Sequence, residues 1–246
     1  MAYKPQLAKP LSLVALRTVG STNDHARELA RSGHPAGVVV WAKEQTAGRG
    51  RQGNSWVSPP GNLYTSIILR PKVNAAQIGQ LSLLAGVALA NVLATLTSPE
   101  HDIRLKWPND LFIDGRKAAG ILVETESQGA RQVPWVVVGI GVNVRHAPEN
   151  AISLADAGVQ DKEAGHVLEL LAAEIMRLVA AWEKDGFADI REAWLGRAYK
   201  LGKTITARLP RETLSGVFED LDSTGALILT GEDGKRHVIN TGEVFA

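Results

Sequence analysis

The longest apolar segment of the chain decides between a membrane protein and a soluble one. It covers residues 75–96 and is about as long as a helix that spans a bilayer. The segment nevertheless carries four polar side chains, at Gln77, Gln80, Ser82 and Asn91. A bilayer tolerates such side chains poorly, so we predict a helix buried in the core of a soluble domain and no membrane partner.

Length and charge narrow the class further. The 246 residues suffice for one large domain or for a large and a small one. With 27 basic and 26 acidic residues, the chain has no overall charge that would favour nucleic acid. The absence of cysteine excludes disulfides, thiolate metal sites and a cysteine nucleophile, and it fits a cytoplasmic location. The histidines lack the spacing of metal ligands, and the N-terminus lacks a signal peptide.

Hydrophobic periodicity predicts an α+β domain followed by a small all-β domain. Strands are expected at residues 11–19, 38–42, 62–70, 103–106, 111–113, 120–125 and 136–144. Helices are expected at residues 22–32, capped by Ser21, and at 75–96, 162–184 and 188–199. From residue 203 onward, short β-type runs recur at 204–209, 216–221, 226–229 and 237–239, which suggests a barrel. We therefore predict a catalytic domain over residues 1–200 and a second domain over residues 201–246.

A glycine–arginine loop at residues 48–53 is the first candidate for chemistry. Its sequence GRGRQG matches the dinucleotide-binding pattern, but that pattern needs a strand directly before it and a helix opening within it. Here the strand ends near Ala42 and Pro59-Pro60 follows the loop, so the dinucleotide interpretation fails. What remains is a backbone rich in N–H groups and two guanidinium groups, which suit carboxylates and phosphates. From the loop alone, a solvated basic loop stays open as an alternative.

Three further motifs carry polar groups in unusual settings. In residues 106–110, KWPND, Asn109 and Asp110 are expected at a strand edge, where the carboxylate of Asp110 could meet a magnesium–phosphate group, although a plain turn is the alternative. Lys117 precedes two alanines and Gly120 and could lie close to a ligand, or it could be a surface lysine. In residues 139–143, GIGVN, the strand glycines indicate close backbone approach with Asn143 at the end, unless they mark a β-bulge.

Together these motifs resemble the biotin protein ligases, also called biotin–[acetyl-CoA-carboxylase] ligases. The resemblance rests on residues 21–23, 45–53, 106–110, 117–120 and 139–143, in that order, and extends over about residues 11–246. It implies a mixed β-sheet flanked by helices, similar to class II aminoacyl-tRNA synthetases, with an SH3-like C-terminal barrel. It also implies that biotin is activated by ATP with Mg²⁺ to biotinyl-5′-AMP and then transferred to a lysine of the biotin carboxyl carrier protein of acetyl-CoA carboxylase.

The resemblance also implies the site residues. The biotin-binding residues would be Ser21, Thr22, Asn23, Gln45, Arg49, Gly50, Arg51, Lys117 and Gly120. The residues that bind ATP and the adenylate would be Arg51, Trp56, Asn109, Lys117 and Asn143. Lys117 and Arg51 would be catalytic, and Asp110 would be a candidate neighbour of Mg²⁺, with no other metal ligand from side chains. The alternating glycines and arginines of the loop suggest a lid that closes over ligand.

Some members of that family carry an N-terminal DNA-binding domain and act as repressors. In this sequence the catalytic pattern begins about twenty residues from the start, so we expect no repressor function. Separately, we expect a monomer or weak homodimer. Two alternatives stay open. One is a lipoate or octanoyl ligase or transferase of the same fold. The other is a non-enzymatic binding protein with an SH3-like adaptor module.

Overall fold

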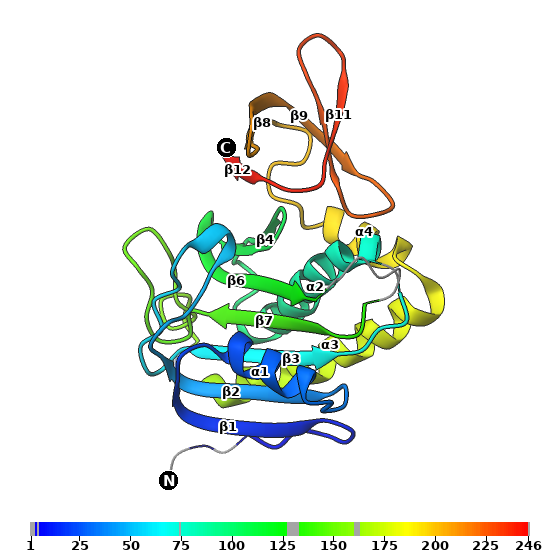
Figure 1. The fold of residues 1–246 in the computed structure, drawn as a ribbon. Helices are drawn as coiled ribbons and strands as arrows, with labels where there is room; N and C mark the ends of the chain where they lie inside the picture. The colour runs from blue at the N-terminus through cyan, green and yellow to red at the C-terminus, as the bar shows by residue number, and fades with distance from the viewer. Residues whose placement is uncertain (1–2, 4, 74, 127–132, 160–162, 246) are drawn as a thin grey trace.

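A seven-stranded mixed sheet forms the body of the molecule (Figure 1). The structure is a computed structural model, and it describes residues 3, 5–73, 75–126, 133–159 and 163–245. The strand order is β1-β2-β3-β7-β6-β5-β4; β1 runs parallel to β2, and every other neighbouring pair is antiparallel. The strands are β1 (Ser12–Val19), β2 (Val38–Gln45), β3 (Leu63–Leu69), β4 (Ile103–Lys106), β5 (Asp110–Ile113), β6 (Arg116–Thr125) and β7 (Val136–Val142).

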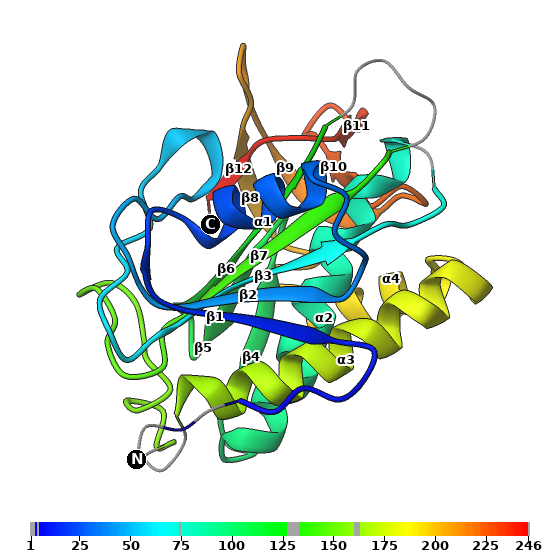
Figure 2. The ribbon, with the colours of Figure 1, turned by 60° about the horizontal axis from the view of Figure 1, so that its bottom comes forward.

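Helices cover the two faces of this sheet unequally (Figure 2). On one face lies α1 (Thr22–Arg31), which packs on β2, β3 and β7. On the other face lie α2 (Ile78–Leu96), preceded by the short 3₁₀ helix η2 (Ala75–Gln77), and α3 (Ala164–Asp185). The apolar helix α2 is buried in the main hydrophobic core, as its polar interruptions predicted.

The central strand β7 shows how the sheet divides core from site. Its residues Val136, Val138, Ile140 and Val142 belong to the core beneath α2 and α3. On the opposite face, Val137 packs with Ala26 of α1. The next two positions on that face are Gly139 and Gly141, because successive residues of a strand alternate between faces. The apolar contacts beneath α1 therefore end at two positions of β7 that have no side chain.

Five strands at the C-terminus form a second, antiparallel sheet in the order β11-β10-β9-β8-β12. They are β8 (Thr204–Arg208), β9 (Thr213–Leu221), β10 (Leu227–Thr230), β11 (Arg236–Ile239) and β12 (Glu243–Phe245). In the described residues the outer strands β11 and β12 do not pair, so hydrogen bonds do not close the expected barrel. Side chains of the body hold this sheet in place; for example, Trp107 Nε1 donates to the Gly225 carbonyl at 3.1 Å, and Gln80 Nε2 donates to the Ser223 carbonyl at 2.9 Å.

Several predicted boundaries differ from the observed ones. Helix α4 (Ala188–Leu195) stops before Tyr199, because Tyr199 N donates to the Leu105 carbonyl and the chain runs beside β4 instead. Strand β6 starts at Arg116, ahead of the expected residue 120. Strand β7 keeps a continuous register with both neighbours, so the β-bulge alternative is wrong. The expected start of the long helix at Lys162 lies outside the described residues.

Candidate active site

A cavity opens on the α1 side of the sheet, over the end of β7 that α1 leaves uncovered. Twelve predicted residues line it: Ser21, Thr22, Asn23, Gln45, Arg49, Gly50, Arg51, Trp56, Asn109, Asp110, Lys117 and Gly120. Further lining residues come from the same segments, including Lys106, Leu122, Gly139 and Gly141, and from Glu243 and Val244 of β12. Five motifs that are far apart in the sequence thus meet around one space.

The base of the cavity is a glycine floor, made of Gly120 of β6 and Gly139 and Gly141 of β7. Gly120 and Gly141 are cross-strand partners. A methyl group on Gly141 would lie 2.6 Å from the indole of Trp56, and one on Gly120 would lie 3.1 Å from it. A methyl group on Gly139 would overlap the amide of Asn23. The predicted close approach is therefore confirmed, and it is made by protein side chains that descend onto the strand backbone.

One wall of the cavity is a buried polar network at the start of α1. Gln45 Oε1 accepts from the backbone N–H of Thr22 at 2.8 Å and from its hydroxyl at 3.1 Å. The Ser66 hydroxyl lies 2.8 Å from the Thr22 hydroxyl and 2.6 Å from Asn23 Oδ1. Ser21 caps the helix by accepting from the backbone N–H of Asp24. Since Ser21, Thr22 and Asn23 are almost fully buried, their positions are set before any ligand arrives.

The glycine–arginine loop folds as a short hairpin. Gly50 N donates to the Asn54 carbonyl at 2.7 Å, and Trp56 N donates to the Gly48 carbonyl at 2.9 Å. The tip is a 3₁₀ turn, Arg51–Gly53, in which Gln52 and Gly53 have φ values of 54° and 80°. Glycine suits the second of these because it adopts left-handed backbone angles without strain. The loop therefore has two defined arms and a tip that carries Arg51.

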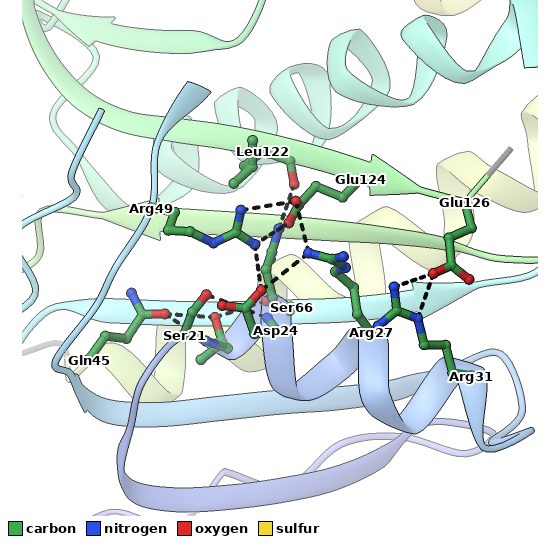
Figure 3. Close-up of polar contacts among 12 residues, drawn as sticks. Ser21, Asp24, Arg27, Arg31, Gln45, Arg49, Ser66, Leu122, Glu124 and Glu126 are labelled. Carbon is green, nitrogen blue, oxygen red and sulfur yellow. Dashed lines mark hydrogen bonds and ion pairs between the residues drawn. The ribbon is translucent and has the colours of Figure 1, made fainter. Parts of the chain in front are cut away.

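The two arginines of the loop have different surroundings. Arg49, on the first arm, reaches Asp24 of α1 at 2.7 Å and both carboxylate oxygens of Glu124 of β6, at 2.8 and 3.1 Å (Figure 3). Burial acts to lower the pKa of Arg49, but the hydrogen bonds and charges of Glu124 and Asp24 raise it overall. The protein's own carboxylates therefore already balance the charge of this guanidinium group.

Arg51 lies deeper and has neutral hydrogen-bond partners. Its Nη1 donates to the Gly242 carbonyl at 3.1 Å and to Asn109 Oδ1 at 3.4 Å. Burial lowers the pKa of Arg51, against the opposing charges of Asp110 and Glu243. A guanidinium group stays charged in proteins, so this lowering indicates a cation that an incoming anion would stabilise.

Lysines complete the cationic side of the cavity. Lys117 Nζ lies 2.7 Å from Asp110 Oδ1, as an ion pair rather than an aligned hydrogen bond, and 5.4 Å from the centre of the Trp56 ring. Burial lowers the pKa of Lys106, and Lys117 adds to this while Asp110 opposes it. Along the cavity, the cations Arg51, Lys106 and Lys117 outnumber the carboxylates of Asp110 and Glu243. The excess of one positive charge favours an anionic ligand.

The indole of Trp56 and the side-chain amide of Asn143 have contrasting surroundings. Trp56 Nε1 is buried and has no hydrogen-bond partner in the described part of the chain, so it is a donor that a ligand could use. Asn143, by contrast, is absent from the cavity lining. Its backbone N–H donates to the Ala118 carbonyl at 2.9 Å, and its side chain donates to the carbonyls of Lys117 and Ile152 at 3.4 and 3.3 Å. Asn143 thus supports the strand that carries Lys117.

Some residues at or near the cavity were not predicted as site residues, and the sequence signals for them differ in strength. Lys106 and Gly139 belong to motifs that were recognised, so their place in the lining follows from their neighbours. Glu243 comes from a three-residue strand without periodicity, and no sequence signal marks it. Asp24 and Glu124 read as ordinary helix and strand charges until the fold brings them to Arg49.

Metal binding by the chain itself finds little support. The described residues contain no group of three or more histidine, cysteine, aspartate or glutamate side chains placed to hold an ion. Asp110 contributes one carboxylate at the cavity. Mg²⁺ is commonly held by one or two carboxylates together with substrate phosphates, so this donor set fits an ion that arrives with a nucleotide.

Comparisons with known proteins agree on one family. The family described as "Biotin/lipoate A/B protein ligase family" matches residues 15–143, and "Biotin protein ligase C terminal domain" matches residues 200–246. The chain is 42% identical to a biotin–[acetyl-CoA-carboxylase] ligase of Paracoccus denitrificans, over 94% of this chain and 98% of that protein. It is 32% identical to a bifunctional ligase/repressor of Bacillus spizizenii, over 92% of this chain and 71% of that protein.

Among solved structures, the chain is similar to a biotin protein ligase from Aquifex aeolicus in complex with biotin and ATP. The TM-score is 0.81 at 29% identity, and the match covers 95% of this chain and 97% of the other.

Proposed function

The chain belongs to the biotin protein ligase family, and we propose that it uses ATP to attach biotin to a lysine of an acceptor protein. One observation carries this proposal: a single cavity combines a buried polar wall, a glycine floor and three cationic side chains. A small ligand with a polar ring suits the buried polar wall. The cations suit a carboxylate and phosphates that must come together.

The first reaction joins two anions. A carboxylate oxygen of biotin attacks the α-phosphate of ATP, the bond from that phosphorus to the bridging oxygen breaks, and pyrophosphate leaves. The product is the mixed anhydride biotinyl-5′-AMP. Arg51 and Lys117 stabilise the charge that develops between carboxylate and phosphate, and Lys106 adds to the local positive potential. Ser21, Thr22, Asn23, Gln45, Gly50 and Gly120 hold biotin, and Trp56 and Asn109 contact the nucleotide, with Asn143 supporting the strand of Lys117.

The second reaction transfers biotin. The amine of an acceptor lysine attacks the acyl carbon of the anhydride, AMP leaves, and the amine loses a proton as the amide forms. Water would destroy the anhydride first if it entered freely, so the loop at residues 48–53 acts as a cover over the cavity. When bound with ATP, Mg²⁺ would neutralise phosphate charge, and Asp110, which lines the cavity, would be the side chain that meets it.

The purified chain should be tested with ATP, Mg²⁺, biotin and a biotin carboxyl carrier protein of acetyl-CoA carboxylase. We expect the carrier mass to rise by one biotin residue and pyrophosphate to appear. A mass increase with lipoate but none with biotin would favour the lipoate alternative. No ATP-dependent pyrophosphate release with either acid would refute the ligase proposal and favour a binding protein.

Three finer properties are part of the proposal. We expect a cytoplasmic enzyme that is a monomer or weak homodimer and does not repress transcription. The near-equal numbers of acidic and basic residues support the absence of specific nucleic-acid binding. Specific, salt-resistant binding to operator DNA in a gel-shift assay would contradict the last expectation, and light scattering on the purified chain tests the oligomeric state.

A further inference from the structure

A buried serine of β3 contacts the polar wall of the cavity from inside the protein. Ser66 is fully buried, and among the described residues it is not one that lines the cavity. Its hydroxyl nevertheless lies within hydrogen-bond distance of two wall side chains, Thr22 and Asn23. We propose that Ser66 is a positioning residue of the biotin site, which orients the Thr22 hydroxyl to accept a hydrogen bond from a ligand N–H group. The assignment of biotin to this cavity rests on the proposed function.

The place of Ser66 in the sheet explains why its hydroxyl reaches the wall. Ser66 is the cross-strand partner of Gly139 in β7. Ile68, two positions further along β3, packs with Ala26 of α1, so the side chain of Ser66 also faces α1. Because Gly139 has no side chain, Asn23 lies directly over it and beside Ser66. The fold therefore places one hydroxyl group against two side chains from the start of α1.

The amide of Asn23 determines where the proton of Ser66 points. Asn23 Nδ2 donates to the Leu122 carbonyl at 3.2 Å and to the Glu124 carboxylate at 2.8 Å. Both amide hydrogens are therefore used, and the amide oxygen Oδ1 faces Ser66 at 2.6 Å. An amide oxygen can only accept, so the single proton of the Ser66 hydroxyl is donated to Asn23.

The proton of Thr22 is then also used within the wall. Since Ser66 donates to Asn23, the Ser66 oxygen is left to accept from the Thr22 hydroxyl, 2.8 Å away. The other acceptor in reach is Gln45 Oε1 at 3.1 Å, which already accepts the backbone N–H of Thr22. With either acceptor, the Thr22 hydroxyl offers only lone pairs to the cavity that it lines. The hydrogen bonds thus run in one direction, from Thr22 through Ser66 towards Glu124 (Figure 3).

A wall that accepts at Thr22 favours a ligand that donates there. The cyclic urea of biotin carries N–H groups, whereas the dithiolane ring of lipoate carries sulfur and no N–H. A site built to hydrogen-bond a polar group of its substrate rejects an analogue that lacks this group, because the buried partner is then left unpaired. By fixing the direction of the hydrogen bonds, Ser66 contributes to the choice between these two acids.

A double-mutant cycle tests whether Ser66 acts through Thr22. We compare the wild-type chain with Ser66→Ala, the isosteric Thr22→Val and the double variant, and measure pyrophosphate release at saturating ATP with varied biotin. Ser66→Ala should raise the KM for biotin about 3- to 10-fold, the range for one neutral hydrogen bond, with kcat within about 2-fold of the wild type. The double variant should have the KM of Thr22→Val alone, because its Ser66 has no hydroxyl left to orient.

Thr65→Val is the matched control. Thr65 precedes Ser66 in β3 and is also buried, and its hydroxyl donates to the Val40 carbonyl at 2.9 Å. Its side chain lies on the opposite face of the sheet, away from the wall. Thr65→Val should therefore lower the urea midpoint about as much as Ser66→Ala does, and it should leave the KM for biotin unchanged.

Three results would overturn the proposal. They are an unchanged KM in the folded Ser66→Ala variant, an equal rise of KM in Thr65→Val, and a double variant whose KM rises above that of Thr22→Val by the full factor seen for Ser66→Ala. If Ser66→Ala does not fold, Ser66→Cys takes its place in the cycle, since a thiol has nearly the same size and is only a weak donor and acceptor.

Urea unfolding without ligand separates this inference from the ligase proposal. A wild-type chain that releases no pyrophosphate with biotin would refute the ligase proposal. The hydrogen bond between Ser66 and Thr22 is then judged by the same variants in urea. Residues that share a hydrogen bond should lose unfolding free energy non-additively, so each substitution costs less when the other is already present. Strictly additive losses would refute the assigned hydrogen bond.

Discussion

The substitution Gly141→Ala tests the glycine floor with a single methyl group. The added carbon would lie 2.6 Å from Cε2 and Nε1 of Trp56 and 2.9 Å from Cζ2. Carbon atoms pack at about 3.5–4.0 Å, so the indole must retreat by roughly 1 Å. The strand backbone cannot move instead, because β7 is hydrogen-bonded on both sides to β3 and β6.

The expected effects on stability and on activity depend on which atoms move to relieve this contact. Trp56 lies at the end of the second arm of the hairpin and is only partly buried, so its displacement should change the free energy of unfolding by less than about 1 kcal/mol. The displaced indole instead changes the geometry of the cavity that Trp56 lines. A misplacement of about 1 Å in a catalytic site can lower the rate by about 100-fold.

The assay is pyrophosphate release with saturating ATP and varied biotin, paired with urea unfolding. We expect Gly141→Ala to lose between about 10- and 100-fold in adenylate formation while its unfolding midpoint stays near that of the wild type. Gly79→Ala is the control, since a methyl group there would lie 3.9 Å from its nearest neighbour, the Thr224 carbonyl. Wild-type adenylate formation by Gly141→Ala would refute the argument that Trp56 is held against the floor for function.

Three further predictions concern charged side chains. Lys117→Ala and Arg51→Ala should each slow biotinyl-AMP formation by about 100-fold, with circular dichroism unchanged; near-normal synthesis would contradict the role of the residue replaced. Asp222 gives a pH prediction: burial acts to raise its pKa, but hydrogen bonds from Thr224 and Ala226 lower it overall from the ordinary value of 3.8. Its stabilisation is therefore complete above that value and is lost as the pH falls through the lowered pKa of the folded state. Urea unfolding between about pH 2 and 5 should show a shallower acid decline for Asp222→Asn than for the wild type.

Local pattern accounts for much of the fold and of the cavity lining. The β-branched runs of β2 and β7 and the long apolar run of α2 predict buried elements. Such continuous apolar runs are stable only where the rest of the domain covers them. The strand glycines Gly139 and Gly141 signalled close approach, since a glycine inside a buried strand loses packing unless something occupies its place. These features were predictable because the information lies within a few neighbouring residues.

Features made by distant segments were not predictable in the same way. Strand β12 has three residues and pairs with β8, whose partner positions lie about 35 residues earlier in the chain. That pairing helps to bring Glu243 to the cavity lining. Likewise Asp24 and Glu124 are separated by 100 positions, and both reach Arg49 only because the fold brings α1, β6 and the loop together. The open arrangement of the C-terminal sheet also depends on such long-range pairing.

The glycine floor has a consequence for how the ligand range of this cavity can change. Glycine is the smallest residue, so any substitution at Gly120, Gly139 or Gly141 makes the cavity shallower and none makes it deeper. A substitution at the floor can therefore narrow the range of accepted ligands in one step, whereas widening must come from residues that lie over the floor, such as Trp56. For laboratory selection of an enzyme that accepts bulkier acids, libraries should leave the three floor positions constant and vary the rim.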